Sequence, residues 1–177
     1  YYNAMKEDLT WLGIKWDKEV IASNDMPIFY KYAEQLVKEG NAYVCSCNKE
    51  KMKKLREEMK ECECRKQNVE KNLEEWKKIL HKKYKEGEKT LRLKGNMKSK
   101  NGIMRDPVIF RISYRKHFIQ GNKYYIWPTY DFENPIEDSL EKVTHVIRSK
   151  EFELRTEMHN YLLKLLKIKG PIIKEIG

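Results

Sequence analysis

The sequence predicts an α/β fold that contains a piece of parallel sheet. An extended apolar segment from Val143 to Ile147 is followed, after a tight turn, by a long amphipathic helix. A second extended segment begins at Pro171. Strand, turn, helix and strand in this order form the unit from which parallel sheets are built. Ligands of such sheets bind beyond the carboxyl ends of the strands, where we expect Arg148 and Ser149.

The first half of the chain is predicted to be mainly helical. A first helix ends at Leu12, with Gly13 as its C-terminal cap. A second helix is capped by Asp25, carries Pro27 in its first turn and ends at Gly40. Its apolar stripe is predicted to consist of Ile28, Tyr32, Leu36 and Val37. A strand over residues 42–44 and charged or amphipathic helices over residues 49–60 and 68–81 follow.

Extended segments dominate after Thr90, at residues 90–93, 108–114 and 124–127. The next helix is predicted to start with Asn134 as its cap and Pro135 at its first position. The long helix after Ser149 should turn four apolar residues inward, namely Leu154, Met158, Leu162 and Leu165. The segment that begins at Pro171 is predicted to be a buried strand.

Positive charge is concentrated in the middle of the chain. The formal net charge is +10, and residues 48–100 hold 19 Lys and Arg against 10 Glu. A surplus of this kind favours a polyanionic partner such as RNA, with its binding surface in this middle stretch.

No segment approaches the roughly 20 apolar residues of a membrane span, and no signal peptide opens the chain. We therefore expect a cytoplasmic protein with neither a membrane nor DNA as its partner.

Four cysteines form two C-x-C pairs, Cys45 with Cys47 and Cys62 with Cys64. Thiolates are soft ligands, and four of them satisfy the tetrahedral demand of zinc. Four unrelated or redox-active thiols are the alternative, which the paired symmetry disfavours. Because four protein ligands leave no open position for water, the predicted role of the zinc is structural.

The order of several segments resembles one protein family. These segments are Arg105 to Ile112, Tyr125 to Phe132, Asp138 to Glu141, and Thr144 with His145. With Trp11 to Gly13, Glu39 to Val44, and Glu151 with Phe152, the resemblance covers essentially the whole chain. The chain is similar to the glutamyl/glutaminyl branch of class I aminoacyl-tRNA synthetases, and in particular to glutamyl enzymes of the archaeal/eukaryotic type.

The resemblance implies a doubly wound (Rossmann-like) nucleotide-binding domain, interrupted by an α+β domain that binds the acceptor end of tRNA. The partial catalytic domain would comprise residues 1–23 and 131–177, and the insertion residues 24–130. Tyr130 would contact the amino-acid side chain, and Ser149 would lie near ATP. Lys100 and Arg105, in a loop that faces the acceptor stem, and Arg56, in the basic stretch, would contact tRNA. Many relatives hold zinc in this insertion, although they often have His where this chain has Cys64.

Neither end of the sequence reads as a natural terminus, so we expect a fragment. Both ATP signatures of the family, the His-Ile-Gly-His-like and Lys-Met-Ser-Lys-Ser-like motifs, fall outside it. Met97 to Lys100 invites confusion with the second motif, but it precedes the strands of the insertion and is interpreted as a basic loop. No catalytic residue is therefore assigned, and the isolated fragment is expected to be inactive. ATP with magnesium is a substrate of the expected parent enzyme.

The choice of amino acid rests on Arg148. A glutamate pocket must pair a carboxylate, and arginine does so with a rigid two-pronged donor. Glutaminyl relatives typically carry a small uncharged residue here, so Arg148 predicts a glutamate–tRNA ligase. An arginine at this position could instead pair with a surface glutamate. A glutaminyl-tRNA synthetase fragment and a non-catalytic, zinc-stapled RNA-binding module therefore stay open as alternatives.

Overall fold

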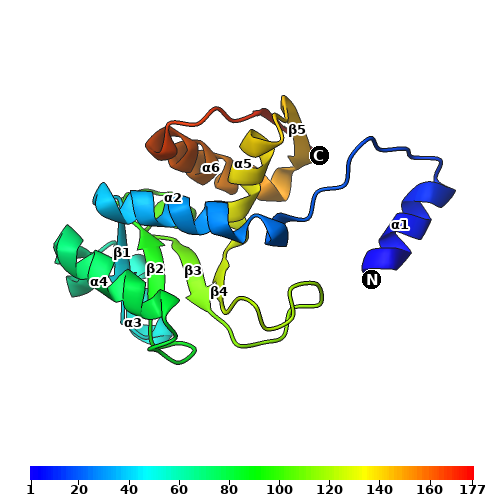
Figure 1. The fold of residues 1–177 in the computed structure, drawn as a ribbon. Helices are drawn as coiled ribbons and strands as arrows, with labels where there is room; N and C mark the ends of the chain where they lie inside the picture. The colour runs from blue at the N-terminus through cyan, green and yellow to red at the C-terminus, as the bar shows by residue number, and fades with distance from the viewer.

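The computed structural model describes residues 1–177, and its central feature is a four-stranded antiparallel sheet (Figure 1). The strand order is β1-β2-β3-β4, so strands that follow each other along the chain are hydrogen-bonded neighbours. The strands are β1 (Ala42–Cys45), β2 (Thr90–Leu93), β3 (Val108–Ile112) and β4 (Ile126–Pro128). The predicted strands are thus confirmed, with β3 and β4 shifted or shortened at their ends.

Two helices pack together beside this sheet. Helix α2 (Met26–Lys38) contacts both β1 and α4 (Val69–Leu80), and the two helices lie next to each other in Figure 1. The apolar face of α2 is rotated from the predicted stripe, because Phe29 and Ala33 are fully buried whereas Ile28 and Tyr32 are only half-buried. The shorter helix α3 (Lys49–Glu57) is also confirmed. Asn48 and Asn68 cap α3 and α4 through side-chain hydrogen bonds to backbone N–H groups.

The C-terminal part is a parallel strand pair with two helices. Helix α5 (Tyr130–Leu140) precedes β5 (His145–Ser149), and α6 (Glu153–Leu166) connects β5 to β6 (Ile172–Ile176). The strands pair in parallel with Arg148 opposite Glu175, which confirms the predicted parallel sheet. Buried residues of α5 and α6, such as Phe132 and Met158, belong to the same apolar core as those of α2 and the antiparallel sheet. One core therefore joins the antiparallel sheet to α2, α5 and α6.

Helix α1 (Tyr2–Trp11) lies apart from this core (Figure 1). None of its residues is buried. It ends as predicted, with Gly13 in the left-handed region at φ 73°. No helix of the chain combines the length and the apolar composition that crossing a bilayer requires.

Four predictions about the C-terminal part are wrong. Helix α5 starts at Tyr130, so Pro135 lies inside the helix instead of opening it. Leu154 is 57% exposed, and Ile172 and Ile176 in β6 are 56% and 62% exposed. In the two-stranded sheet alternate residues of β5 and β6 face solvent, which is why β6 is not a buried strand. Arg148 and Ser149 are the last two residues of β5 and do not lie beyond it.

Candidate functional site

The four cysteines converge at the end of β1. Cys45 is the last residue of β1, and Cys62 and Cys64 lie at the short 3-10 helix η2 (Glu63–Lys66). All four Sγ atoms lie within 4.8 Å of one another. Cys45–Cys62 and Cys47–Cys64 are each separated by 3.9 Å between sulfurs. Sulfurs at about 2.3 Å from a tetrahedral ion are about 3.8 Å apart, so the four thiols have the spacing and the chemistry of a closed zinc site.

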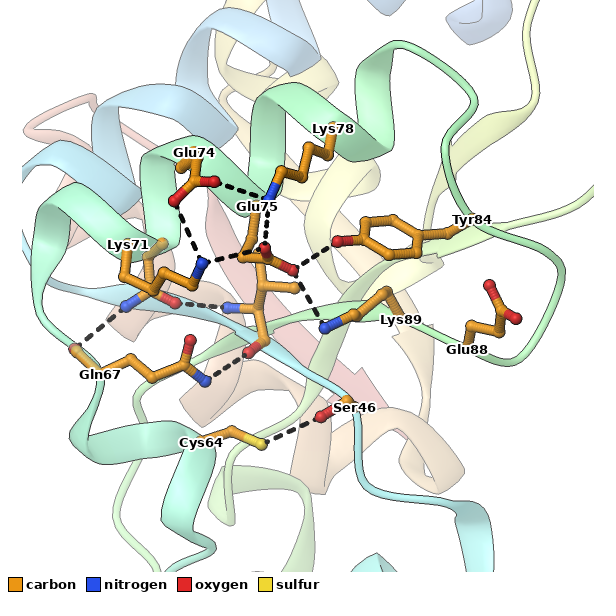
Figure 2. A network of polar contacts seen from close by, with 12 residues as sticks. Ser46, Cys64, Gln67, Lys71, Glu74, Glu75, Lys78, Tyr84, Glu88 and Lys89 are labelled. Carbon is orange, nitrogen blue, oxygen red and sulfur yellow. Dashed lines mark hydrogen bonds and ion pairs between the residues drawn. The ribbon is translucent and has the colours of Figure 1, made fainter.

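Polar neighbours stabilise negative charge on this cysteine quartet. A hydrogen bond from Cys45 lowers the pKa of the Cys62 thiol to about 5, against the opposing effect of burial. The same contact with Cys62 raises the pKa of Cys45. Ser46 Oγ lies 3.6 Å from Cys64 Sγ (Figure 2). The quartet therefore holds at least one thiolate ready to bind a cation.

A basic cleft lies beside the quartet. It has a volume of about 700 Å³ and extends from Cys47 to Thr129, the residue before α5. One acidic residue, Glu57, lines it together with six basic residues, which are Lys49, Lys53, Arg56, Arg92, Arg105 and Arg111. Burial, together with the neighbouring charges of Arg92 and Arg105, lowers the pKa of Arg56. Such crowding of like charge in a concave surface attracts anions.

Of the three residues that sequence analysis assigned to tRNA, the structure brings two together. Arg105 donates to the carbonyl oxygens of Ser99 and Arg56 at 2.8 and 2.9 Å. Arg56 in turn donates to Gly102 O at 2.7 Å. Both guanidinium groups thus fix the cleft wall as well as line it. Lys100 is exposed and is not among the lining residues of the cleft.

Sequence reasoning missed Arg92 and Arg111. They lie in β2 and β3, where each is the one charged residue of its strand. That interruption of an apolar strand was a usable signal, because a charged residue in a strand must face solvent, a partner or a cleft.

A second polar cluster surrounds Arg148 at the end of β5. The Arg148 side chain is only 8% exposed. Its guanidinium donates to His159 Nδ1 at 3.3 Å and to Asn134 Oδ1 at 3.4 Å, and Asp138 Oδ2 lies 4.0 Å away. None of these contacts is short, so the donors of Arg148 are oriented but not saturated.

His159 links Arg148 to Asp131. Arginine can only donate, so His159 Nδ1 must accept the bond from Arg148. The ring proton then lies on Nε2, which faces Asp131 Oδ1 at 3.2 Å. Asp131 also forms an ion pair with Arg155. Although burial opposes it, these two contacts lower the pKa of Asp131.

Tyr130 lies next to this cluster. It is the first residue of α5 and is 42% exposed. Its ring packs 5.9 Å from the rings of both His159 and Phe152, and the Arg155 guanidinium lies 5.7 Å from its centroid. Tyr130 and Arg148 therefore share His159 as a neighbour. Ser149 is exposed at the strand end. His159, Asp131 and Arg155 were not foreseen, because they read as ordinary helix residues.

Comparisons with known proteins identify the family of the chain. Residues 1–176 match the family of class I tRNA synthetases (E and Q), catalytic domain. The chain is 49% identical over 171 residues to the glutamate–tRNA ligase of Nitrosopumilus maritimus, a match that covers 97% of this chain and 30% of that protein. It is 42% identical to the glutamate–tRNA ligase of Cenarchaeum symbiosum, which covers all of this chain and 31% of that protein. The chain thus spans about a third of the length of these curated relatives.

A solved structure shows the same fold. It is a glutamate tRNA ligase from Elizabethkingia meningosepticum in complex with its amino acid, with a TM-score of 0.64 and 22% sequence identity. The likeness covers 99% of this chain and 39% of that one. The parallel strand pair with its helices is consistent with the Rossmann-like domain of that class. The chain belongs to the class I tRNA synthetases (E and Q), as part of their catalytic domain.

Proposed function

We propose that this chain is part of a glutamate–tRNA ligase, which joins glutamate to AMP from ATP and then transfers it to the terminal ribose of tRNA. Arg148 carries the proposal. It is a nearly buried guanidinium whose position is fixed by Asn134 and His159 and whose hydrogen-bonding capacity is not used up. A glutamate carboxylate can fill that capacity. Glutamine brings no negative charge to this guanidinium, whose own carboxylate neighbour Asp138 stays 4.0 Å away, and this disfavours a glutaminyl enzyme.

The other assigned residues fit the same proposal. Tyr130 would contact the substrate side chain from the start of α5, and Ser149 would face ATP and its magnesium from the end of β5. The cysteine quartet would hold one structural zinc. Residues 24–130 would form the insertion that receives the tRNA acceptor end, with residues 1–23 and 131–177 in the catalytic domain. Amino-acid activation would still require the ATP-binding motifs of the full-length protein.

Amino-acid activation by the full-length protein tests the role of Arg148. Arg148→Cys removes the charge that pairs the substrate, which should cost about 3 to 5 kcal/mol of glutamate recognition. We expect kcat/KM for glutamate to fall at least about 10²-fold. The value of kcat/KM for glutamine should fall far less, and KM for ATP should change little. The control is Arg115→Cys, which removes an exposed arginine of the insertion. Unchanged glutamate activation in Arg148→Cys, with glutamine still refused, would show that another residue reads the side chain.

The basic cleft is the proposed surface for the tRNA acceptor end. Lys49 and Lys53 line the cleft on α3, so Lys49→Glu/Lys53→Glu should weaken tRNA binding. The slope of log affinity against log salt should also fall, by about 0.9 for each phosphate that the protein no longer neutralises. Lys31→Glu/Lys77→Glu makes the same change in net charge on exposed faces of α2 and α4. Equal effects of the two pairs would mean that net charge, and not the cleft, binds tRNA.

A further inference from the structure

Asp106 is a fully buried carboxylate beside the cysteine quartet. Its exposed fraction is 0%, and its backbone is in the left-handed region at φ 45°. The Tyr43 hydroxyl donates to Oδ2 at 3.0 Å, and Arg65 Nε lies 3.0 Å from the same oxygen. Gly95 N donates to Oδ1 at 2.8 Å. A buried charge with this many short contacts fixes the positions of all the groups around it.

Two of these neighbours connect Asp106 directly to the proposed zinc ligands. The Tyr43 hydroxyl oxygen lies 3.4 Å from Cys62 Sγ. Arg65 follows Cys64 in the chain, and both residues lie within η2. A metal ion that holds Cys62 and Cys64 therefore also determines where η2 presents the Arg65 guanidinium. Outer contacts of this kind orient metal ligands and contribute to metal affinity.

On its other side, Asp106 closes a loop, residues 95–106, that we term the bridging loop. Arg65 Nη2 donates to Gly95 O at 2.8 Å, and Arg92 Nη1 donates to Asp106 O at 2.9 Å. The two ends of the loop are so close that a Cβ atom on Gly95 would lie 2.0 Å from Met104 O. The loop can therefore close only with glycine at this position, and Arg65 and Asp106 hold it closed.

The far end of the bridging loop contacts α6. Asn101 Nδ2 donates to Leu154 O at 2.7 Å and to Glu157 Oε2 at 2.8 Å. Just before the loop, Lys94 O accepts a bond from the Tyr161 hydroxyl at 2.9 Å. The loop also contains Arg105, which fixes the wall of the basic cleft. One short segment thus reaches the quartet through Tyr43 and Arg65, and it contacts both the cleft and the helix that carries His159.

We propose that Asp106 couples metal binding by the cysteine quartet to the closed conformation of the bridging loop. The proposal rests on the zinc site proposed above. Zinc fixes η2, η2 fixes Arg65, and Arg65 with Tyr43 fixes Asp106 and the base of the loop. Coupling of this kind is reciprocal, so the loop must retain the metal as strongly as the metal orders the loop.

The test uses the full-length protein, loaded with zinc and then stripped of it. Two quantities are measured: the rate of zinc release to a chelator and the amide hydrogen exchange of residues 95–106. In the unmodified protein, removal of zinc should accelerate exchange in the loop. Asp106→Asn keeps a residue type that tolerates positive φ but removes the charge. It should release zinc about 10- to 100-fold faster and show fast loop exchange that zinc removal does not increase further.

Two further variants sharpen the result. Tyr43→Phe keeps the ring and deletes the hydroxyl, so it should change both quantities in the same direction and serves if Asp106→Asn does not fold. Glu63→Gln is the control, because Glu63 lies between two ligand cysteines but is exposed and forms its ion pair with Lys66. A protein that binds no zinc refutes the metal centre itself. A protein that binds zinc but shows loop exchange unaffected by metal removal, or zinc release unaffected by both variants, refutes only the coupling.

Discussion

A buried glutamate at the centre of a lysine network should make a large, pH-dependent contribution to the stability of this chain (Figure 2). Glu75 on α4 is 5% exposed. Its Oε2 accepts from the Tyr84 hydroxyl at 2.7 Å and pairs with Lys89 at 3.0 Å. Its Oε1 pairs with Lys78 at 3.1 Å and with Lys71 at 3.5 Å. Glu75→Gln keeps the shape of the side chain but removes the charge that these groups surround.

The size of this contribution to the free energy of unfolding follows from the pKa of Glu75. Burial alone would raise this pKa, but the hydrogen bonds from Tyr84, Lys89 and Lys78 lower it from 4.5 to about 2. Because the pKa of the folded state lies below that of the unfolded state, the stabilisation is present above about pH 4.5 and is lost as the pH falls towards 2. A difference of about 2.5 pKa units corresponds to about 3 kcal/mol at pH 7, of which about half should remain at pH 3.

Urea unfolding of the parent chain and of Glu75→Gln at pH 7 and pH 3 measures this contribution. We expect a difference in unfolding free energy of about 3 kcal/mol at pH 7 and clearly less at pH 3. The matched control is Glu74→Gln, because Glu74 pairs with the same Lys71 and Lys78 but its side chain is 53% exposed. Exposed ion pairs contribute little, so this control should change stability much less. Equal losses in the two variants, or a loss in Glu75→Gln that does not depend on pH, would refute the reasoning.

Two other predictions concern α5 and α6. Burial and the nearby charges of Asp25, Glu133 and Glu141 raise the pKa of Glu137 to about 7, so its favourable contribution is present below about pH 4.5 and lost as the pH rises through 7. Glu137→Gln should therefore stabilise the chain at pH 8 by up to about 3 kcal/mol and at pH 5 by much less. Thermal unfolding at both pH values measures the gain in stability. A gain that is the same at both pH values would contradict this prediction. In the full-length protein, His159→Leu should raise KM for glutamate while KM for ATP stays constant. His159→Gln can both accept and donate a hydrogen bond, so its KM for glutamate should lie closer to that of the parent. Equal KM values for glutamate in the two variants would exclude an orienting role for His159.

The sequence was sufficient for features that depend on local chemistry. The helices predicted over residues 49–60 and 68–81 form, and the structure adds that Asn48 and Asn68 cap them, because an Asx side chain satisfies the free N–H groups of the first turn. Gly13 ends α1 for an equally local reason. The paired C-x-C spacing predicted a four-thiol cluster, and the sulfurs do converge.

Predictions failed where packing overrides a local signal. Asn134 and Pro135 have the form of a helix start, but α5 begins five residues before Pro135, at Tyr130. The N–H groups of Phe132 and Glu133 already donate to Thr129 O, so the first turn is complete before Pro135 is reached. Phe132 and Ile136 then anchor this helix in the common core. The long-range gain from burying these side chains exceeds the cost of one missing backbone hydrogen bond, which no sequence window reveals.

Long-range contacts that the sequence does not reveal also decide what the residues of the basic stretch do. From the sequence we expect the Lys and Arg surplus of residues 48–100 to form one RNA-facing surface, but the structure divides these residues into groups with different surroundings. Some lysines pair with glutamates of their own helix, as Lys78 does with Glu74, and Lys89 pairs with the buried Glu75. Arg56, Arg92 and Arg105 line the cleft and also bind backbone carbonyl oxygens. Guanidinium groups can serve in both ways because they offer five donors in fixed directions and stay charged when partly buried. The positive potential of the cleft is therefore part of its framework, which is why reversing the cleft lysines on α3 tests RNA binding with less risk to the fold than replacing these arginines.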